Sequence, residues 1–439
     1  MQITIDKLIY GGDGLGRLPA GAEGRAKTVF VPFVLEGEQV DVAVQEERPS
    51  FLRASAQRIV EPSPDRVTPR CPHFGTCGGC HYQHAGYPHQ LESKRAILEE
   101  TLRRTAKIEL AVPIETHSAE PWHFRNRTRM RVQAQPEFAI GYFRHGSHDL
   151  LPVRECPISS PLINRALAIL WTLGERGAFS SSVREVQFFA NAEDSELLIE
   201  IYLDGATDPA SQGPLGEAIR AEIAECRGVV IFRSSVAGEE TGERGSRTVP
   251  RSVPAVSTGE EHLVYRVGGF EYRVSAGSFF QTNRHLVAKL VSLVTGGATG
   301  KNALDLYAGA GLFTLPLAKN FERVVAVEVS PYSFPDLQRN APVHVKAIQK
   351  PTEQFLHDTT GANFDLVVVD PPRAGLGESA SRRLGRMHVS HVTYVSCDPS
   401  TLARDLRTLL ESGFRVEQAH LVDLFPQTFH IESVFQLAR

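Results

Sequence analysis

A cysteine that directly follows an expected strand is the first residue in this sequence with a chemistry of its own. The β-branched run at Val392–Val395 predicts a buried strand, and Pro399 requires that strand to end within a few residues. The thiol of Cys397 then lies at the carboxyl end of a strand, which is where ligands bind in open α/β sheets. A thiol in this position is either a core residue or a nucleophile, and this stretch alone leaves both interpretations open.

Three other apolar, strand-like runs also stop at polar side chains, namely Tyr307, Glu328 and Asp370. An acid such as Glu328 suits a ribose diol, because two hydroxyl groups can donate to one carboxylate. The glycines after Tyr307 let the backbone approach a ligand closely at a helix N-terminus. A dinucleotide fingerprint would place its third glycine where Thr314 stands, which argues against a dehydrogenase. Parallel strands would bring these groups and Cys397 to one edge of a sheet.

Four further cysteines have the spacing of a metal centre. Cys71, Cys77 and Cys80 form a C-x5-C-x2-C pattern, and Cys156 is available as a fourth ligand. Four thiolates suit either tetrahedral zinc or a [4Fe–4S] cluster. Structural zinc sites usually show two close pairs of ligands, so three clustered cysteines with a distant fourth favour the cluster. The zinc alternative stays open at this point.

The most basic segment of the chain is a candidate for contact with RNA. Arg125, Arg127, Arg129 and Arg131 occupy alternate positions, so a strand would place all four on one face. A line of guanidinium groups matches a phosphate backbone. The alternative is a solvated face that pairs with the protein's own acids. If these arginines bind RNA, alanine at Arg125 or Arg127 weakens binding and reduces its salt dependence.

The elements that must position these residues divide into three expected domains. Residues 1–62 contain short β-rich runs separated by glycine turns, which predicts an OB-like β-barrel of five strands. Residues 63–270 carry the cysteine and arginine motifs and are expected to form a central β-rich domain. Residues 271–439 alternate strands with helices, which is typical of α/β proteins with a Rossmann-like parallel sheet.

The sequence also predicts individual helices, loops and a closing strand within these domains. We expect helices over about 86–105 and 161–174, and loops at 205–214 and 237–261. The closing run 429–437 alternates as a strand, with Glu432 on the face opposite Phe435. Spacing alone leaves Glu432 as either a surface residue of an edge strand or a functional acid.

Composition limits the class of protein. A chain of 439 residues with 42% hydrophobic and 22% charged residues is typical of a globular protein of about three domains. No apolar run approaches the roughly 20 residues of a membrane span, and the N-terminus lacks an export signal. Six cysteines in a long chain indicate metal or catalytic use in a reducing compartment. We therefore expect a cytoplasmic protein, and the net charge of −4 excludes a uniformly basic nucleic-acid binder.

Taken together, these motifs resemble the RNA uracil-C5 methyltransferase family, which makes 5-methyluridine in tRNA and 23S rRNA with S-adenosylmethionine. The resemblance covers nearly the whole chain and rests on the cysteine set, FRNR, FFQTN, DLYAGAG, DPPRAG, SCDP and HIES. It implies an N-terminal TRAM barrel, a [4Fe–4S] cluster on the four cysteines, Cys397 as nucleophile and Glu432 as base. The pocket for S-adenosylmethionine would be lined by Gln281, Tyr307, Glu328 and Asp370.

The resemblance implies methyl transfer to C5 of one uridine through a covalent bond between Cys397 and C6 of the base. The barrel and the cluster favour 23S rRNA over tRNA as the substrate, and we expect a monomer. An alternative of a different class is a non-catalytic iron–sulfur protein that only binds RNA. Calorimetry of S-adenosylmethionine binding would separate the two.

Overall fold

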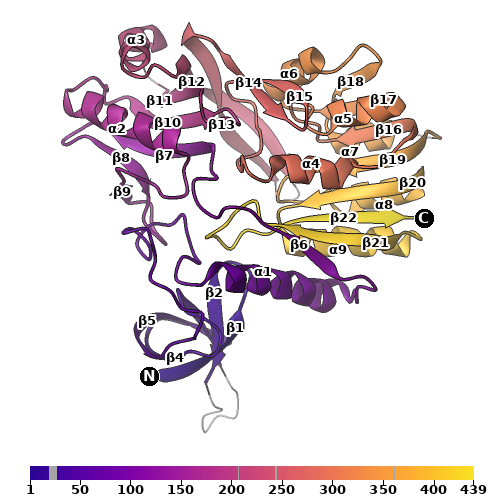
Figure 1. Cartoon of the computed structure of the whole chain (residues 1–439), viewed down its shortest axis with the longest axis horizontal. Coiled ribbons are helices and arrows are strands. Elements are labelled where there is room, and N and C mark those ends of the chain that lie inside the picture. The colour runs from indigo at the N-terminus through magenta and orange to yellow at the C-terminus, as the bar shows by residue number, and fades with distance from the viewer. Residues whose placement is uncertain (19–26, 206, 243–244, 360) are drawn as a thin grey trace. The chain divides into compact units, whose positions relative to one another are not determined.

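The computed structural model describes residues 1–18, 27–205, 207–242, 245–359 and 361–439, although the side chains of 234–251 are not described (Figure 1). The chain forms two compact units. The first comprises Met1–Pro121, Pro371–Gly385 and Tyr394–Arg439, and the second comprises Trp122–Asp370 and Arg386–Thr393. The strand β20 (His388–Ser396) begins in the second unit and ends in the first. The three-domain boundaries expected from the sequence stay a prediction.

A closed five-stranded barrel begins the first unit and confirms the expected N-terminal fold. Its strand order is β1-β2-β3-β5-β4, with bounds β1 (Gln2–Leu8), β2 (Asp13–Arg17), β3 (Thr28–Pro32), β4 (Gln39–Glu47) and β5 (Phe51–Glu61). Alternate aliphatic residues such as Ile3, Ile5, Val29 and Val31 fill the interior. One of the expected glycine turns joins β1 to β2, where Gly11 and Gly12 adopt φ values of +109° and +98° that favour glycine, and Asp13 already begins β2.

The rest of the first unit combines helices with the C-terminal strands. These elements are α1 (Tyr87–Thr101), a π-helical turn (Leu102–Ala106), β6 (Ile114–His117), α8 (Glu378–Arg386), α9 (Pro399–Glu411), β21 (Arg415–Val422) and β22 (Glu432–Ala438). Strand β21 pairs antiparallel with β22 and parallel with β6. Helix α1 packs against both β6 and α9 (Figure 1). The expected helix at 86–105 is therefore confirmed, with its α-helical part ending at Thr101.

A buried ion pair holds α1 onto the loop that precedes β22. Lys94 and Asp423 are both inaccessible to solvent, and Lys94 Nζ lies 2.6 Å from Asp423 Oδ1. Lys94 also donates to the carbonyl of Phe425 at 2.9 Å, and the hydroxyl of Tyr87 donates to Asp423 Oδ2 at 2.9 Å. Burial lowers the pKa of Lys94, and the charge of Asp423 opposes that shift. The pair tolerates burial because its polar atoms are hydrogen-bonded.

Replacing Lys94 by methionine should therefore be strongly destabilising. The change leaves the Asp423 carboxylate buried without its cation, which costs about 3–5 kcal/mol of unfolding free energy. A matched control is Arg95→Met in the same helix, because Arg95 pairs with Glu99 on the exposed surface at 2.9 Å. That control should cost about 0.5 kcal/mol. Urea denaturation measures both variants, and equal small losses would contradict the role of the buried pair.

The second unit contains a seven-stranded sheet in the order β13-β12-β11-β10-β7-β8-β9. Its strands are β7 (Arg127–Gln133), β8 (Ala139–Phe143), β9 (Leu150–Pro152), β10 (Val183–Ala190), β11 (Leu197–Leu203), β12 (Cys226–Gly242) and β13 (Gly245–Gly259). The helices α2 (Pro161–Glu175) and α3 (Gly213–Glu222) pack against the sheet and against each other (Figure 1). The expected helix at 161–174 is confirmed by α2.

Both expected loops of this region are wrong. A 3-10 turn (Pro209–Gln212) and the start of α3 occupy much of 205–214, and most of 237–261 belongs to the antiparallel pair β12 and β13. Residues 206 and 243–244 lie outside the described part of the chain. Composition misleads here because backbone pairing does not require apolar side chains. Strand β13 lies at an edge of the sheet, where a proline such as Pro254 is tolerated.

The second unit also contains a parallel α/β layer, which confirms the Rossmann-like fold class. The parallel strands lie in the order β18-β17-β16-β19. Their bounds are β16 (Gly300–Leu306), β17 (Phe321–Glu328), β18 (Val345–Gln349) and β19 (Asn363–Val369), and the helices are α4 (Val287–Thr295), α5 (Thr314–Asn320), α6 (Ser333–Asn340) and α7 (Thr352–Asp358). A two-stranded sheet, β14 (His262–Val267) with β15 (Phe270–Ser275), precedes this layer. None of the helices in the described ranges combines the length and apolar character needed to cross a bilayer.

Candidate active site

Cys397 lies in a tight turn between β20 and α9, as the sequence predicts. Asp398 caps the helix, because its Oδ1 accepts hydrogen bonds from the backbone amides of Ser400 and Thr401 at 2.9 and 3.0 Å. The Ser396 hydroxyl donates to the Asp398 carbonyl at 3.0 Å. These local bonds fix the turn, and the side chain of Cys397 is half-exposed within it.

Glu432 is the first residue of β22, and only 4% of it is exposed. The alternative of a surface residue on an edge strand is therefore wrong for this acid. The hydroxyl of Ser433 donates to the carbonyl of Ser396 at 3.3 Å. Cys397 follows Ser396 in the chain, and Glu432 precedes Ser433. Cys397 and Glu432 are therefore each adjacent in sequence to one partner of this hydrogen bond, within the first unit. The strand that precedes Cys397 and the strand that contains Glu432, both expected from the sequence, are thus joined in the structure.

Tyr10 is a neighbour of Cys397 that the sequence did not reveal. It lies in the turn between β1 and β2, and its hydroxyl donates to the Cys397 carbonyl at 3.3 Å. Its ring meets Phe429 edge-on at 5.5 Å, and Phe429 also contacts His81 at 4.7 Å. Burial raises the pKa of Tyr10, and the nearby Asp398 raises it further. Tyr10 therefore stays a neutral hydrogen-bond donor at physiological pH.

Arg373, from the DPPR motif, belongs to the same cluster of side chains. Its guanidinium lies 3.3 Å from Nε2 of His430, whose ring contacts that of Phe429 in a tilted arrangement at 4.2 Å between ring centroids. The backbone carbonyl of Arg373 accepts a hydrogen bond from the Thr401 hydroxyl at 3.1 Å. The turn at Cys397 is thus surrounded by aromatic rings and an exposed cation, which suits a stacked base with a phosphate.

The predicted ribose-binding acid lies at the carboxyl end of β17 in the second unit. Glu328 Oε2 accepts from the Gly309 amide at 2.7 Å, and Oε1 accepts from the Ser330 amide at 2.6 Å. Each oxygen keeps a further lone pair, so the carboxylate can still accept from two hydroxyl groups. Tyr307 begins the glycine loop in a left-handed conformation with φ of 63°, a strained arrangement that is common at functional sites.

A second acid, Asp305, is fully buried in β16 beneath this loop. The hydroxyl of Thr314 donates to its Oδ2, whereas Oδ1 has no hydrogen-bond partner in the described part of the chain. Burial, together with the charges of the nearby Asp370 and Glu328, raises the pKa of Asp305 to about 7. Thr314 therefore supports an acid where a dinucleotide site would have its third glycine. Three acids in close electrostatic contact indicate a site for a cationic ligand.

Gln281, the fourth predicted pocket residue, is buried in a segment held by the FRNR motif. The backbone amide of Asn126 donates to the carbonyl of Thr282 at 3.0 Å, and the backbone amide of Arg284 donates to the carbonyl of Phe124 at 3.0 Å. The side chain of Gln281 is 7% exposed. The two motifs are thus hydrogen-bonded to each other, a relation that their separation along the chain concealed.

The four predicted RNA-binding arginines fall into different environments. Arg127 is buried against Glu200 at 3.0 Å and donates to the Ser278 carbonyl, so it supports the FFQTN segment. Arg129 and Arg131 share one acid, Glu185, each at 2.6 Å. Their alternation along β7 is confirmed, and three of the four pair with the protein's own acids, as the alternative interpretation expected. RNA binding by these residues stays a prediction.

Arg125 departs from the expected arrangement because it precedes β7. Its backbone forms isolated bridges with Ser159 and Asn283 instead of extending the strand. Beside the outer end of β7 lies a cavity of about 440 Å³ in the second unit. Its lining includes cationic, amide and aromatic side chains, namely Arg131, Arg184, His148, Gln133, Gln135 and Phe143. This size and chemistry suit a nucleotide.

Three of the four predicted cluster cysteines lie in an irregular segment between β5 and α1. Cys80 is buried, whereas Cys71 and Cys77 are half-buried. The Gly79 amide donates to Sγ of Cys77 at 3.4 Å, an interaction that stabilises negative charge on sulfur. Cys156 belongs to the second unit, where Asn164 holds its backbone through bonds of 2.9 and 3.0 Å. A centre that these four cysteines hold together stays a prediction.

Comparisons with known proteins agree with this chemistry. Residues 259–439 match the tRNA (Uracil-5-)-methyltransferase family, and residues 1–56 match the TRAM domain. An uncharacterized RNA methyltransferase of Aquifex aeolicus is 32% identical over 439 residues, which covers 99% of this chain and 97% of that protein. The 23S rRNA (uracil(1939)-C(5))-methyltransferase RlmD of Shewanella amazonensis is 31% identical over 433 residues, covering 96% and 93%.

One solved structure has the same fold along the full length of both chains. It is the Pyrococcus abyssi tRNA (uracil-54, C5)-methyltransferase in complex with S-adenosyl-L-homocysteine, with a TM-score of 0.75 and 24% identity. The fold of this chain is therefore a known one.

Proposed function

Because this chain belongs to the family of S-adenosylmethionine-dependent RNA uracil-C5 methyltransferases, we propose that it methylates C5 of one uridine in 23S rRNA. The support for 23S rRNA is the likeness to RlmD along more than nine-tenths of both chains. The same chemistry on a tRNA uridine is the second candidate.

Mass mapping of 5-methyluridine in RNA from a strain that lacks this chain tests the substrate. We expect one 23S rRNA uridine to lose its methyl group, with tRNA unchanged. Loss from tRNA alone would replace the substrate while leaving the chemistry in place. Restoring the gene should restore the modification, and restoring it with Cys397→Ala should not.

The hydrogen bond between Ser433 and Ser396 is the observation that carries the proposed mechanism. Carbon 5 of uracil is a poor nucleophile, so a thiolate must first add to C6 and push electron density onto C5. Cys397 adds to C6, and C5 then forms its bond to the methyl group while the bond from that methyl group to the sulfonium sulfur breaks, which leaves S-adenosylhomocysteine. Glu432 removes the proton from C5, the double bond re-forms, and the sulfur of Cys397 leaves C6.

The acids of the second unit fit S-adenosylmethionine. Glu328 can accept both ribose hydroxyls with the lone pairs that its two backbone bonds leave available. The unpartnered Oδ1 of Asp305 and the carboxylate of Asp370 favour a ligand that carries positive charge, as a sulfonium and an ammonium do. Gln281 and Tyr307 complete the proposed set of contacts.

A uridine stacked in a helix cannot reach a side chain such as Cys397, so the base must be flipped out of the RNA. Flipping costs a few kcal/mol and least in a loop, which favours an unpaired target. Phe429, His430 and Arg373 offer rings and a cation beside the nucleophile. The cavity next to Arg131 in the second unit offers a place for another nucleotide of the bound RNA.

The environments of the arginines predict two different outcomes for one kind of mutation. Arg131→Ala should weaken RNA binding and reduce the slope of log K against log salt by about 1, because one phosphate contact is lost. Arg127→Ala should instead lower thermal stability, because it leaves the buried Glu200 without its cation. Binding titrations at several salt concentrations and thermal melts measure the two effects. An unchanged salt slope for Arg131→Ala would remove this arginine from the RNA interface.

We also propose that Cys71, Cys77, Cys80 and Cys156 hold a [4Fe–4S] cluster. Two observations support the assignment: the spacing of the cysteines, and the hydrogen bond from the backbone amide of Gly79 to Sγ of Cys77. Such a cluster would cross-link the irregular segment before α1 rather than take part in methyl transfer. Iron and sulfide analysis of anaerobically purified protein should give four of each per chain, lowered in Cys77→Ser. Zinc in place of iron would contradict the assignment.

A further inference from the structure

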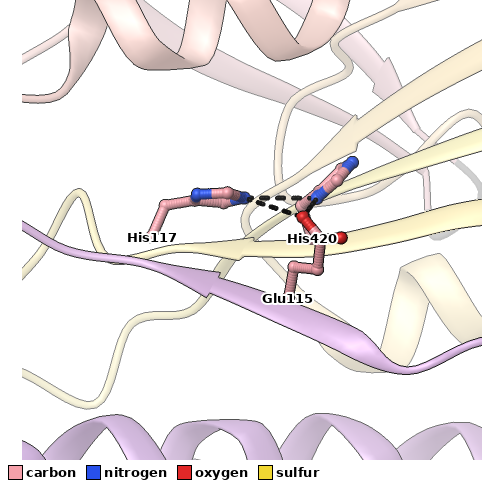
Figure 2. Close-up of side chains that lie close together, drawn as sticks. All are labelled: Glu115, His117 and His420. Carbon is pink, nitrogen blue, oxygen red and sulfur yellow. Dashed lines mark hydrogen bonds and ion pairs between the residues drawn. The ribbon is translucent and has the colours of Figure 1, made fainter.

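Three side chains on neighbouring strands of the first unit bring their donor atoms together (Figure 2). Glu115 and His117 lie two residues apart on β6, so the period of a strand places both on one face. Strand β21 runs parallel beside β6, with His420 opposite Glu115 in the register. The side chain of His420 therefore meets the other two on that face.

The distances among these donors match a metal site. His117 Nε2 lies 3.2 Å from His420 Nδ1, His420 Nδ1 lies 3.4 Å from a Glu115 carboxylate oxygen, and that oxygen lies 3.9 Å from His117 Nε2. A triangle with these sides has a point about 2.0 Å from all three atoms. Zinc binds imidazole nitrogen at about 2.0–2.1 Å and carboxylate oxygen at about 2.0–2.2 Å.

The side-chain amide of Gln418 favours the tautomer of His420 that can bind a metal through Nδ1. Its Nε2 lies 3.2 Å from the side-chain oxygen of Gln418, which can only accept a hydrogen bond. The proton of neutral His420 is therefore on Nε2, and the lone pair of Nδ1 points toward His117 and Glu115. Ligating histidines in metal sites are commonly held by such a bond from their other nitrogen.

Exposure is graded across the three ligands. His420 is 3% exposed and the side chain of His117 is 16% exposed, whereas that of Glu115 is 64% exposed. A metal held by this set would be shielded on the histidine side and open to water on the glutamate side. A water molecule can then supply a fourth ligand from the open side.

We propose that Glu115, His117 and His420 bind one Zn²⁺ ion, which clips the four-residue strand β6 to β21. Strand β6 lies at the edge of its sheet. A metal that bridges two strands binds the folded state in preference to the unfolded chain, so its binding free energy adds to stability. The site is independent of the cysteine set and of the methyl-transfer chemistry.

Metal titration of the full chain tests the proposal, with Zn²⁺ alone as the probe. The protein is first treated with a mild chelator, which leaves the proposed cysteine-bound cluster in place. We expect one Zn²⁺ per chain and a rise in Tm when Zn²⁺ is added. Glu115→Gln should weaken zinc binding roughly tenfold or more, because it removes the anionic ligand. Glu115 is exposed, so the Tm of this variant without zinc should match that of the parent.

His117→Asn should abolish the site, and His388→Asn, at an exposed histidine in β20, should leave it intact. X-ray absorption of the zinc-loaded protein should show two imidazole ligands and oxygen in the first coordination sphere. Zinc bound through sulfur alone, or a zinc-induced shift in Tm that survives in the Glu115→Gln and His117→Asn double variant, would overturn the proposal. So would a parent protein whose Tm does not respond to zinc.

Discussion

Alanine at position 397 should abolish 5-methyluridine formation while leaving S-adenosylmethionine binding intact. Without the thiolate no bond forms at C6, and C5 of uracil never becomes nucleophilic enough to accept the methyl group. The expected loss is roughly 10⁴-fold or more in turnover, as for other essential nucleophiles. Among the proposed cosubstrate contacts, Glu328 ends β17, Tyr307 and Asp370 directly follow β16 and β19, and Gln281 lies between β15 and α4. None of these segments contains Cys397. Transfer of labelled methyl to RNA measures turnover, and calorimetry measures cosubstrate binding.

Cys226 provides a matched control for this experiment. It is buried at the start of β12, and burial raises the pKa of its thiol to about 12, so it is protonated under assay conditions. Cys226→Ala should therefore retain methylation, although loss of a buried side chain will lower stability. Appreciable methylation by Cys397→Ala would refute the covalent mechanism.

Glutamine at position 432 should trap RNA on the protein. The amide keeps the shape of the side chain but cannot accept the C5 proton, so the methylated base stays bonded to Cys397. Glu432, the first residue of β22, is buried. Water therefore has little access to this position and cannot readily act as the base in its place. The adduct should appear as a protein band of increased mass on a denaturing gel after incubation with RNA and S-adenosylmethionine.

The double variant Cys397→Ala/Glu432→Gln is the control for that band and should show none. Glu417→Gln, at an exposed acid of β21, should turn over normally without an adduct. If Glu432→Gln is slow yet accumulates no adduct, another group removes the proton. The assignment of the base would then fail while the nucleophile stood.

Local sequence patterns were sufficient for the elements that end at the proposed site. The β-branched run before Cys397 and the following proline determine a strand end almost without tertiary context. The same holds for the runs before Glu328 and Asp370. Patterns failed at β12 and β13, because a Gly-, Ser- and Pro-rich sequence gives no apolar period although its backbone can still pair.

Long-range partners could not be read from the sequence. Tyr10 and Cys397 are 387 positions apart, and only the closed barrel brings the tyrosine to the turn. The row of arginines in β7 has the same spacing whether each cation faces a phosphate or an acid of its own protein. Glu200 and Glu185, which pair with three of them, come from other strands of the same sheet.

The contact between Tyr10 and the carbonyl of Cys397 means that the N-terminal barrel is not a detachable RNA handle. An enzyme shortened to begin after residue 62 would lose the hydrogen bond from Tyr10 to the Cys397 turn together with any RNA contact that the barrel makes. Such a fragment should be impaired even on a free oligonucleotide that needs no docking. A barrel taken from a distant relative would have to place a hydroxyl group next to the carbonyl of Cys397. The barrel and the segment that carries Cys397 are therefore expected to evolve together.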